Sequence, residues 1–232
     1  MFSVIQLPGS NDDRDLHFAM KSVLGAPAKL VWHKDAALPA DTAGVLIPGG
    51  FSYGDYLRAG AMARFAPILA DVKRFADNGG PVLGICNGFQ ILCESGLLPG
   101  ALVRNHHLHF VCEEVILRVE HARAPFTSRA RQGQTLRIPI KHGEGAYHAS
   151  PELLERIEAN GQVRLRYVDA AGEATPAANP NGSVANIAGV TSERGNVLGL
   201  MPHPEHAVEA GLGGEDGRVV LGSLVDALAG SH

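Results

Sequence analysis

The feature that most constrains the fold is a recurring alternation of short apolar runs with segments of helical periodicity. Three such runs, Phe2 to Leu7, Gly44 to Ile47 and Pro81 to Ile85, are typical of buried strands, and helical patterns lie between them. Successive strands joined by helices form parallel sheets that are covered on both faces. The alternation therefore predicts an α/β fold with a mainly parallel sheet.

The middle of the chain changes to a period of two. Val115, Leu117 and Val119 alternate with more polar residues, which is typical of an antiparallel strand with one buried face. The segment from Thr135 to Ile140 is its expected partner. This section predicts antiparallel strands added to the parallel sheet. With no internal repeat or linker in between, residues 1–232 are expected to form a single domain.

Composition narrows the class of partner. The chain of 232 residues has a formal net charge of −4, which provides no general attraction for nucleic acid or an anionic membrane. No stretch approaches the ~18 consecutive apolar residues of a membrane span. The 3 cysteines lack the spacing of a zinc site, and their odd number disfavours a framework of disulfides. We therefore expect them to be reduced thiols. We expect a cytoplasmic protein that acts on a small molecule or binds another protein.

The stretch PVLGICNGFQIL carries the strongest chemical signal. Cys86 lies where a buried strand meets a helix, and Gly84 and Gly88 stand two residues to either side, as in a nucleophile elbow with cysteine in place of serine. Unpaired N–H groups at a helix N-terminus favour the thiolate. The alternative is a small buried apolar residue, a description that fits Cys93 and Cys112 better. Cys86 is therefore the predicted nucleophile.

A base for this thiol is found directly after the last apolar run, in Met-Pro-His203-Pro204-Glu205. In an extended backbone, residues i and i+2 point the same way, so Glu205 is expected to accept a hydrogen bond from the His203 imidazole. The other ring nitrogen would then face the thiol. The alternative is a surface histidine in a proline-rich loop, one of 11 histidines in the chain.

Two glycines follow another buried strand, in Pro48-Gly49-Gly50-Phe51. Glycine frees the backbone to aim N–H groups at a developing negative oxygen. The amides of Gly50 or Phe51, with that of Asn87, are the expected oxyanion hole. The alternative interpretation is an ordinary turn.

Five histidines raise the question of a metal site. Three lie in RNHHLHF and two follow further along the chain, but no acidic or cysteine ligand stands at a recognised spacing from them: His106, His107, His109, His142 and His148. We predict that the chain holds no metal.

Taken together, GICNGFQIL and MPHPEH resemble the class I, triad-type glutamine amidotransferases, whose pattern is Gly-x-Cys-x-Gly-x-Gln followed by His-x-Glu. More narrowly, LPGSNDDRD, GGFSYGDYLRAG, HGEG and NPNGS are similar to segments of the glutaminase subunits of phosphoribosylformylglycinamidine synthases. The likeness extends from Val4 to about Gly217. It implies a flavodoxin-like open sheet with added antiparallel strands.

The resemblance also implies a reaction. Cys86 would attack the side-chain carbonyl of glutamine, and His203 would protonate the departing ammonia and then activate water against the thioester. Gln90 and Phe51 are expected to contact the substrate.

Partners and cofactors follow from the same resemblance. The chain has no Gly-x4-Gly-Lys-Ser/Thr loop, so no cofactor is expected in it. The resemblance places ATP and magnesium on a large synthetase subunit, which uses the ammonia to convert formylglycinamide ribonucleotide to formylglycinamidine ribonucleotide, commonly with a small third subunit. Loops 51–60 and 142–148 are the expected docking or gating segments.

Two positions depart from the family pattern. Asp12 stands where these subunits often have cysteine, in Asn-Cys-Asp-Arg-Asp, and His206 stands where arginine is common. We expect neither to touch the triad, although His206 could compete for Glu205.

Two rival functions remain open. One is a stand-alone cysteine hydrolase or stress-response protein on a similar scaffold, but in many of those a histidine follows the cysteine directly, whereas here Asn87 does. The other is a non-catalytic module, against which the intact set of Cys86, His203 and Glu205 argues.

Overall fold

The computed structural model describes residues 1–229, and its core is one large sheet. The strands and α-helices are β1 (Phe2–Gln6), α1 (Asp13–Phe18), β2 (Ala28–Trp32), β3 (Gly44–Ile47), α2 (Pro67–Asp77), β4 (Val82–Ile85), α3 (Asn87–Glu94), β5 (Ala101–Val103), β6 (Val111–Val119), β7 (Thr135–His142), β8 (Ala146–His148), α4 (Pro151–Ala159), β9 (Val163–Val168), β10 (Ile187–Thr191), β11 (Val197–Leu200) and α5 (Gly217–Ala229). Short helical turns lie between them, among them η2 (Ser52–Asp55), η6 (Pro204–His206) and η7 (Ala210–Leu212).

The sheet has 9 strands in the order β2-β1-β3-β4-β11-β10-β9-β6-β7. From β2 to β11 all neighbours are parallel, and from β11 to β7 all neighbours are antiparallel. A second, two-stranded sheet pairs β5 with β8. In the parallel half, β2 lies on one side of β1 and β3 lies on the other, so the order of the strands changes direction between β1 and β3. Ligands of open α/β sheets bind outside the carboxyl ends of the strands near such a switch point.

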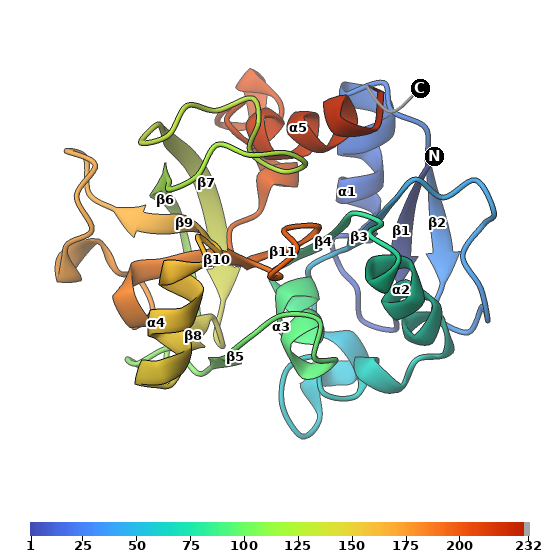
Figure 1. The fold of residues 1–232 in the computed structure, drawn as a ribbon, viewed down its shortest axis with the longest axis horizontal. Helices are drawn as coiled ribbons and strands as arrows, with labels where there is room; N and C mark the ends of the chain where they lie inside the picture. The colour runs from blue at the N-terminus through green and yellow to red at the C-terminus, as the bar shows by residue number, and fades with distance from the viewer. Residues whose placement is uncertain (230–232) are drawn as a thin grey trace.

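Helices cover both faces of the parallel half. Figure 1 shows α1 and α5 on one side of the sheet and α2 and α3 on the other. The inner strands are buried along their whole length: all four residues of β3, β4 and β11 are buried. Strands that are buried on both faces read as continuous apolar runs, which is why the sequence identifies them.

The structure confirms the predicted α/β class, with added antiparallel strands. Strand β10, which lies between β11 and β9, is not predicted from the sequence. Its sequence IAGVT is short, contains glycine and is buried throughout, so it shows no period of two. Helix α2 begins at Pro67, since proline fixes the backbone at the first helical position and has no N–H to leave unpaired. No helix of the described part is both long and apolar enough to cross a membrane.

Candidate active site

Cys86 occupies a strained turn between β4 and α3. Its backbone angles are φ 50° and ψ −105°, a left-handed conformation that residues with a side chain rarely adopt, and its N–H donates to the Leu200 carbonyl at 2.8 Å. The two flanking positions have no room for a side chain, which explains why both are glycine. A Cβ at Gly88 would overlap the Ile47 carbonyl, and a Cβ at Gly84 would overlap the backbone of Gly88. The elbow geometry therefore requires both glycines.

The Cys86 side chain borders a cavity of about 260 Å³ at the carboxyl edge of the parallel strands. Cys86 itself is only 5% exposed, and its Sγ lies 3.7 Å from the Lys141 carbonyl oxygen. His203 lines the same cavity and follows β11, the strand next to β4. Two segments far apart in the sequence thus bring the thiol and the imidazole to one cavity.

Glu205 orients the imidazole. The Nδ1 atom of His203 lies 2.6 Å from Glu205 Oε1, and both side chains are buried. The extended backbone expected here is wrong: Pro204, Glu205 and His206 form a single 3-10 turn, which proline can start because it needs no N–H partner. The turn still lets the carboxylate reach back to the ring of His203.

The surroundings of His203 shift the pKa of its imidazole. Burial lowers the pKa of the imidazole, but the Glu205 carboxylate and the Cys86 sulfur beside it raise that pKa to about 10. The Cys86 side chain interacts with this ring, and among residues 1–229 no other group pairs with the buried Nε2 atom. Glu205 therefore holds Nδ1, and Nε2 remains for proton transfer within the cavity.

The backbone amides near Cys86 limit the choice of oxyanion donors. The Phe51 N–H already donates to the Gly9 carbonyl at 2.8 Å. Of the two predicted donors, Gly50 and Phe51, the Gly50 amide is therefore the better candidate for the oxyanion hole. Gly50 has φ 139°, and a Cβ there would overlap Gly9 and Ser10 backbone, which explains glycine at this position. The amide of Asn87 lies at the start of α3, where helix N–H groups are unpaired. These roles stay predictions.

A chain of hydrogen bonds holds two residues of the cavity wall, Gln90 and Glu144. Asn87 Nδ2 donates to Gln90 Oε1 at 2.8 Å, and Gln90 Nε2 donates to the Glu144 carbonyl at 2.6 Å. Gln90 and Phe51, the expected substrate contacts, both line the cavity. Phe110, which was not predicted, lines it too, with its ring centroid 6.5 Å from that of Phe51.

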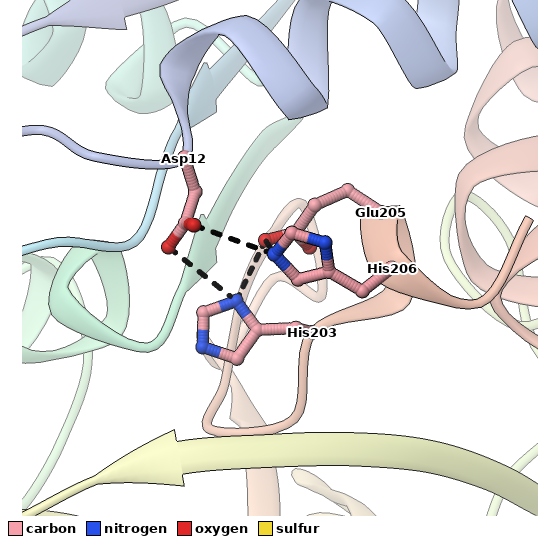
Figure 2. Close-up of side chains that lie close together, drawn as sticks. All are labelled: Asp12, His203, Glu205 and His206. Atoms are coloured by element: carbon pink, nitrogen blue, oxygen red, sulfur yellow. Dashed lines mark hydrogen bonds and ion pairs between the residues drawn. The ribbon is translucent and has the colours of Figure 1, made fainter. Parts of the chain in front are cut away.

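The triad has a neighbour that sequence reasoning missed. Asp12, in the segment before α1, is 3% exposed, and its Oδ2 lies 3.7 Å from His203 Nδ1 (Figure 2). Its Oδ1 accepts hydrogen bonds from the Lys141 ammonium and, at 3.3 Å, from His206 Nε2. The expectation that positions 12 and 206 lie away from the triad is therefore wrong. The available signal was that both positions depart from the family pattern.

The same four side chains bear on the question of a metal. Asp12, His203, Glu205 and His206 form the one group of at least three His, Cys, Asp or Glu residues, within residues 1–229, whose ligand atoms all lie within 4.8 Å of one another. The Lys141 ammonium and the two imidazoles already pair with the two carboxylates, and one buried oxygen of Glu205, Oε2, has no hydrogen-bond partner among the described residues.

The histidine-rich run uses its rings for backbone contacts. His107 Nδ1 accepts from the His109 N–H at 3.1 Å, and its Nε2 donates to the Pro180 carbonyl at 3.1 Å. His142 is buried against Asn105 and Asn181, and burial with the nearby charge of His203 lowers its pKa to about 4. The prediction of no metal in this chain stays a prediction.

The two expected docking segments differ in exposure. Residues 51–60 include Tyr56 and Leu57, which are 76% and 85% exposed. In residues 142–148, by contrast, most side chains are buried, and His142 and Tyr147 belong to the interior. Residues 142–144 line the cavity. The docking or gating role of both segments stays a prediction. Of the two other cysteines, Cys112 was expected to be a buried apolar residue but is exposed. Cys93, a residue of α3, is partly buried, and burial raises the pKa of its thiol.

The fold and the site together define a class: an α/β protein with a cysteine elbow, a histidine and a carboxylate at the carboxyl edge of a parallel sheet. Residues 2–212 match the CobB/CobQ-like glutamine amidotransferase domain, and the chain belongs to this family.

Relatives with curated names are similar over nearly their whole length. A phosphoribosylformylglycinamidine synthase subunit PurQ from Salinibacter ruber is 57% identical, covering 97% of this chain and 95% of the relative. The PurQ subunit from Chlorobaculum tepidum is 54% identical, with 98% and 97% covered. Among solved structures, PurLQS from Thermotoga maritima matches with a TM-score of 0.86 and 43% identity, covering 98% of each chain.

Proposed function

We propose that this chain is the glutaminase subunit of a phosphoribosylformylglycinamidine synthase. It hydrolyses glutamine to glutamate and ammonia and supplies the ammonia to an ATP-dependent synthetase subunit, which converts formylglycinamide ribonucleotide to formylglycinamidine ribonucleotide in purine biosynthesis. One observation carries the chemistry: Cys86 and His203 border one cavity at the ends of adjacent strands, with His203 Nδ1 held by Glu205. The similarity to PurQ subunits supports the choice of pathway.

The first half of the reaction forms a thioester. The Cys86 sulfur attacks the side-chain carbonyl carbon of glutamine, and the carbonyl oxygen becomes an oxyanion that the amides of Gly50 and Asn87 stabilise. The His203 imidazolium then gives its Nε2 proton to the leaving nitrogen, and ammonia departs. Glu205 stabilises the positive charge of the ring while the proton is held there.

The second half hydrolyses the thioester. His203, now neutral, takes a proton from water, and the resulting hydroxide attacks the thioester carbonyl and releases glutamate. The C–S bond breaks as glutamate leaves, and the Cys86 thiolate and the His203 imidazolium are restored for the next cycle. Gln90 and the exposed ring of Phe51, at the mouth of the cavity, position the glutamine.

The rest of the machinery belongs to other chains. We expect no cofactor in this chain, and ATP with magnesium on the synthetase subunit, accompanied by a small third subunit. The 3 free cysteines are consistent with work in the reducing cytoplasm.

The decisive experiment separates the use of glutamine from the use of ammonia in the assembled synthase. Cys86→Ala should abolish glutamine-dependent synthesis, by at least about 10³-fold, while synthesis from added ammonium chloride continues. Cys112→Ser, at an exposed cysteine on β6, is the matched control and should retain both activities. Glutamine-dependent synthesis in Cys86→Ala would contradict the proposal.

A labelling experiment separates this function from a stand-alone hydrolase. A glutamine-mimicking electrophile should alkylate Cys86, and glutamine should protect it. Alkylation that is indifferent to glutamine would favour the hydrolase.

A further inference from the structure

Two positions that depart from the family pattern, 194 residues apart, meet at one point of the structure. His206 Nε2 lies 3.3 Å from Asp12 Oδ1, and both residues stand beside the ring of His203. Figure 2 shows the Asp12 carboxylate pointing at both imidazoles from the opposite side of the cluster to the Glu205 backbone.

Asp12 is held as a carboxylate by its surroundings. Burial by itself raises the pKa of this side chain, but the hydrogen bond with His206, the charge of His203 and the ammonium of Lys141 lower it well below its ordinary value. Asp12 is therefore negatively charged whenever the enzyme works.

This charge acts on His203 directly. The 3.7 Å between Asp12 Oδ2 and His203 Nδ1 is too long for a hydrogen bond but within ion-pair distance, and both side chains are almost fully buried. Little water screens a pair of this kind. Because the interaction is mutual, the imidazolium that lowers the pKa of Asp12 is itself stabilised by the Asp12 carboxylate.

The other titratable groups around His203 come from three parts of the fold. Glu205 and His206 lie on its own turn η6, Cys86 lies between β4 and α3, and Lys141 and His142 lie on β7. Lys141 and His206 both pair with Asp12, and the Lys141 side chain is about a third exposed. Asp12 and Lys141 are charged groups next to the triad that can each be replaced without removing a member of it.

We propose that Asp12 is a positioning residue that acts as a second carboxylate for His203. Hydrogen bonds from Lys141 and His206 hold it in place, and its charge sets the pH range over which this subunit hydrolyses glutamine. The proposal rests on the proposed function, since it concerns the same triad.

The test is the pH dependence of glutamine-driven kcat/KM in the assembled synthase. Asp12→Asn keeps the size of the side chain and removes its negative charge, which disfavours the protonated forms of both Cys86 and His203. The acid and alkaline limbs should therefore both move to lower pH by about 1 unit. Asp12→Cys, which restores the common family residue, should move them in the same direction.

An opposite change guards against a merely structural effect. Lys141→Met removes a positive charge from the same network and should move both limbs to higher pH. Asp15→Asn, at an exposed aspartate of α1, loses the same charge as Asp12→Asn and should leave both limbs in place. Ammonia-driven synthesis, which bypasses the triad, should be unchanged in every variant.

The outcomes are distinct. Unmoved limbs in Asp12→Asn, or limbs that move in the same direction in Asp12→Asn and Lys141→Met, would overturn the inference. If Asp12→Asn does not fold, Lys141→Met decides alone, and unmoved limbs in it would also overturn the inference. Failure of the proposed function has a separate signature, which is glutamine use by Cys86→Ala.

Discussion

At the scale of single residues, this site is governed by where charges are buried. Asp55, on the cavity wall, shows the reverse of Asp12: burial and the nearby Glu144 carboxylate raise its pKa to about 6, against a weaker opposing contact with Asn87. Its ionised form is therefore disfavoured in the folded protein. Two aspartates of one cavity differ because one has cationic partners and the other has a second carboxylate.

The sign of the Asp55 effect on stability follows from linkage. An unfolded aspartate has a pKa of about 3.9, and folding raises the pKa of Asp55 to about 6. The unfolded chain therefore loses this proton first, so the cost to stability grows between about pH 4 and about pH 6 and is constant at higher pH. Asp55→Asn should therefore stabilise the chain by on the order of 1 kcal/mol at pH 8, after allowance for solvent screening at a partly exposed site, and by nothing near pH 4. Thermal melts at the two pH values measure this.

The control for this prediction is Asp41→Asn, at an exposed aspartate away from the cavity. It should give the same melting temperature as the parent protein at both pH values. A gain in stability of Asp55→Asn that is as large at pH 4 as at pH 8 would show that ionisation is not the cause.

At the scale of elements, the elbow depends on close packing between α3 and β3. The first turn of α3 lies so near β3 that a Cβ at Gly88 would overlap the Ile47 carbonyl, a rigid backbone group that cannot move aside. The helix N-terminus can reach the nucleophile only because this approach is possible.

Gly88→Ala should accordingly destabilise the chain by about 2 to 3 kcal/mol, the range for overpacking in a well-packed interior, and lower glutaminase activity as the elbow shifts. Gly211→Ala is the matched control, because a Cβ at Gly211 has no neighbour within 4 Å and the backbone there is not left-handed. Chemical denaturation of the two variants compares them. Equal stability would mean that the elbow can relax.

At the scale of the whole molecule, exposed apolar side chains lie in the cavity lining and in the loop that follows Phe51. Tyr56 and Leu57 project from the loop after β3, and Phe51 and Phe110 border the opening itself. Exposed apolar groups that cluster around an active site are typical of a surface that another chain covers.

A double change of Tyr56→Ser and Leu57→Ser should therefore weaken assembly with the synthetase subunit by at least about tenfold, while the melting temperature of the isolated chain changes little. Leu212→Ser, at a 70% exposed leucine of η7, is the control and should assemble normally. Unchanged assembly of the double variant, measured by titration of the two subunits, would remove the loop from the interface.

The sequence alone determined the α/β class and the chemistry of the nucleophile. Buried strands and the elbow are local patterns, so Gly84, Cys86 and Gly88 can be identified without knowing what packs against them. The His203 and Glu205 pair is local too, and its hydrogen bond forms even though the backbone is a turn rather than the expected extended segment.

Only the tertiary structure decided which charges surround that pair. Asp12, Lys141 and His206 come from the segment before α1, from β7 and from η6, and no pattern in the sequence relates them. The same holds for strand β10, which is recognisable by its pairing with β9 and β11 and not by its composition. The physical reason is one of range: backbone periodicity acts between near neighbours in the chain, whereas electrostatic interactions and strand pairing act between residues that only folding brings together.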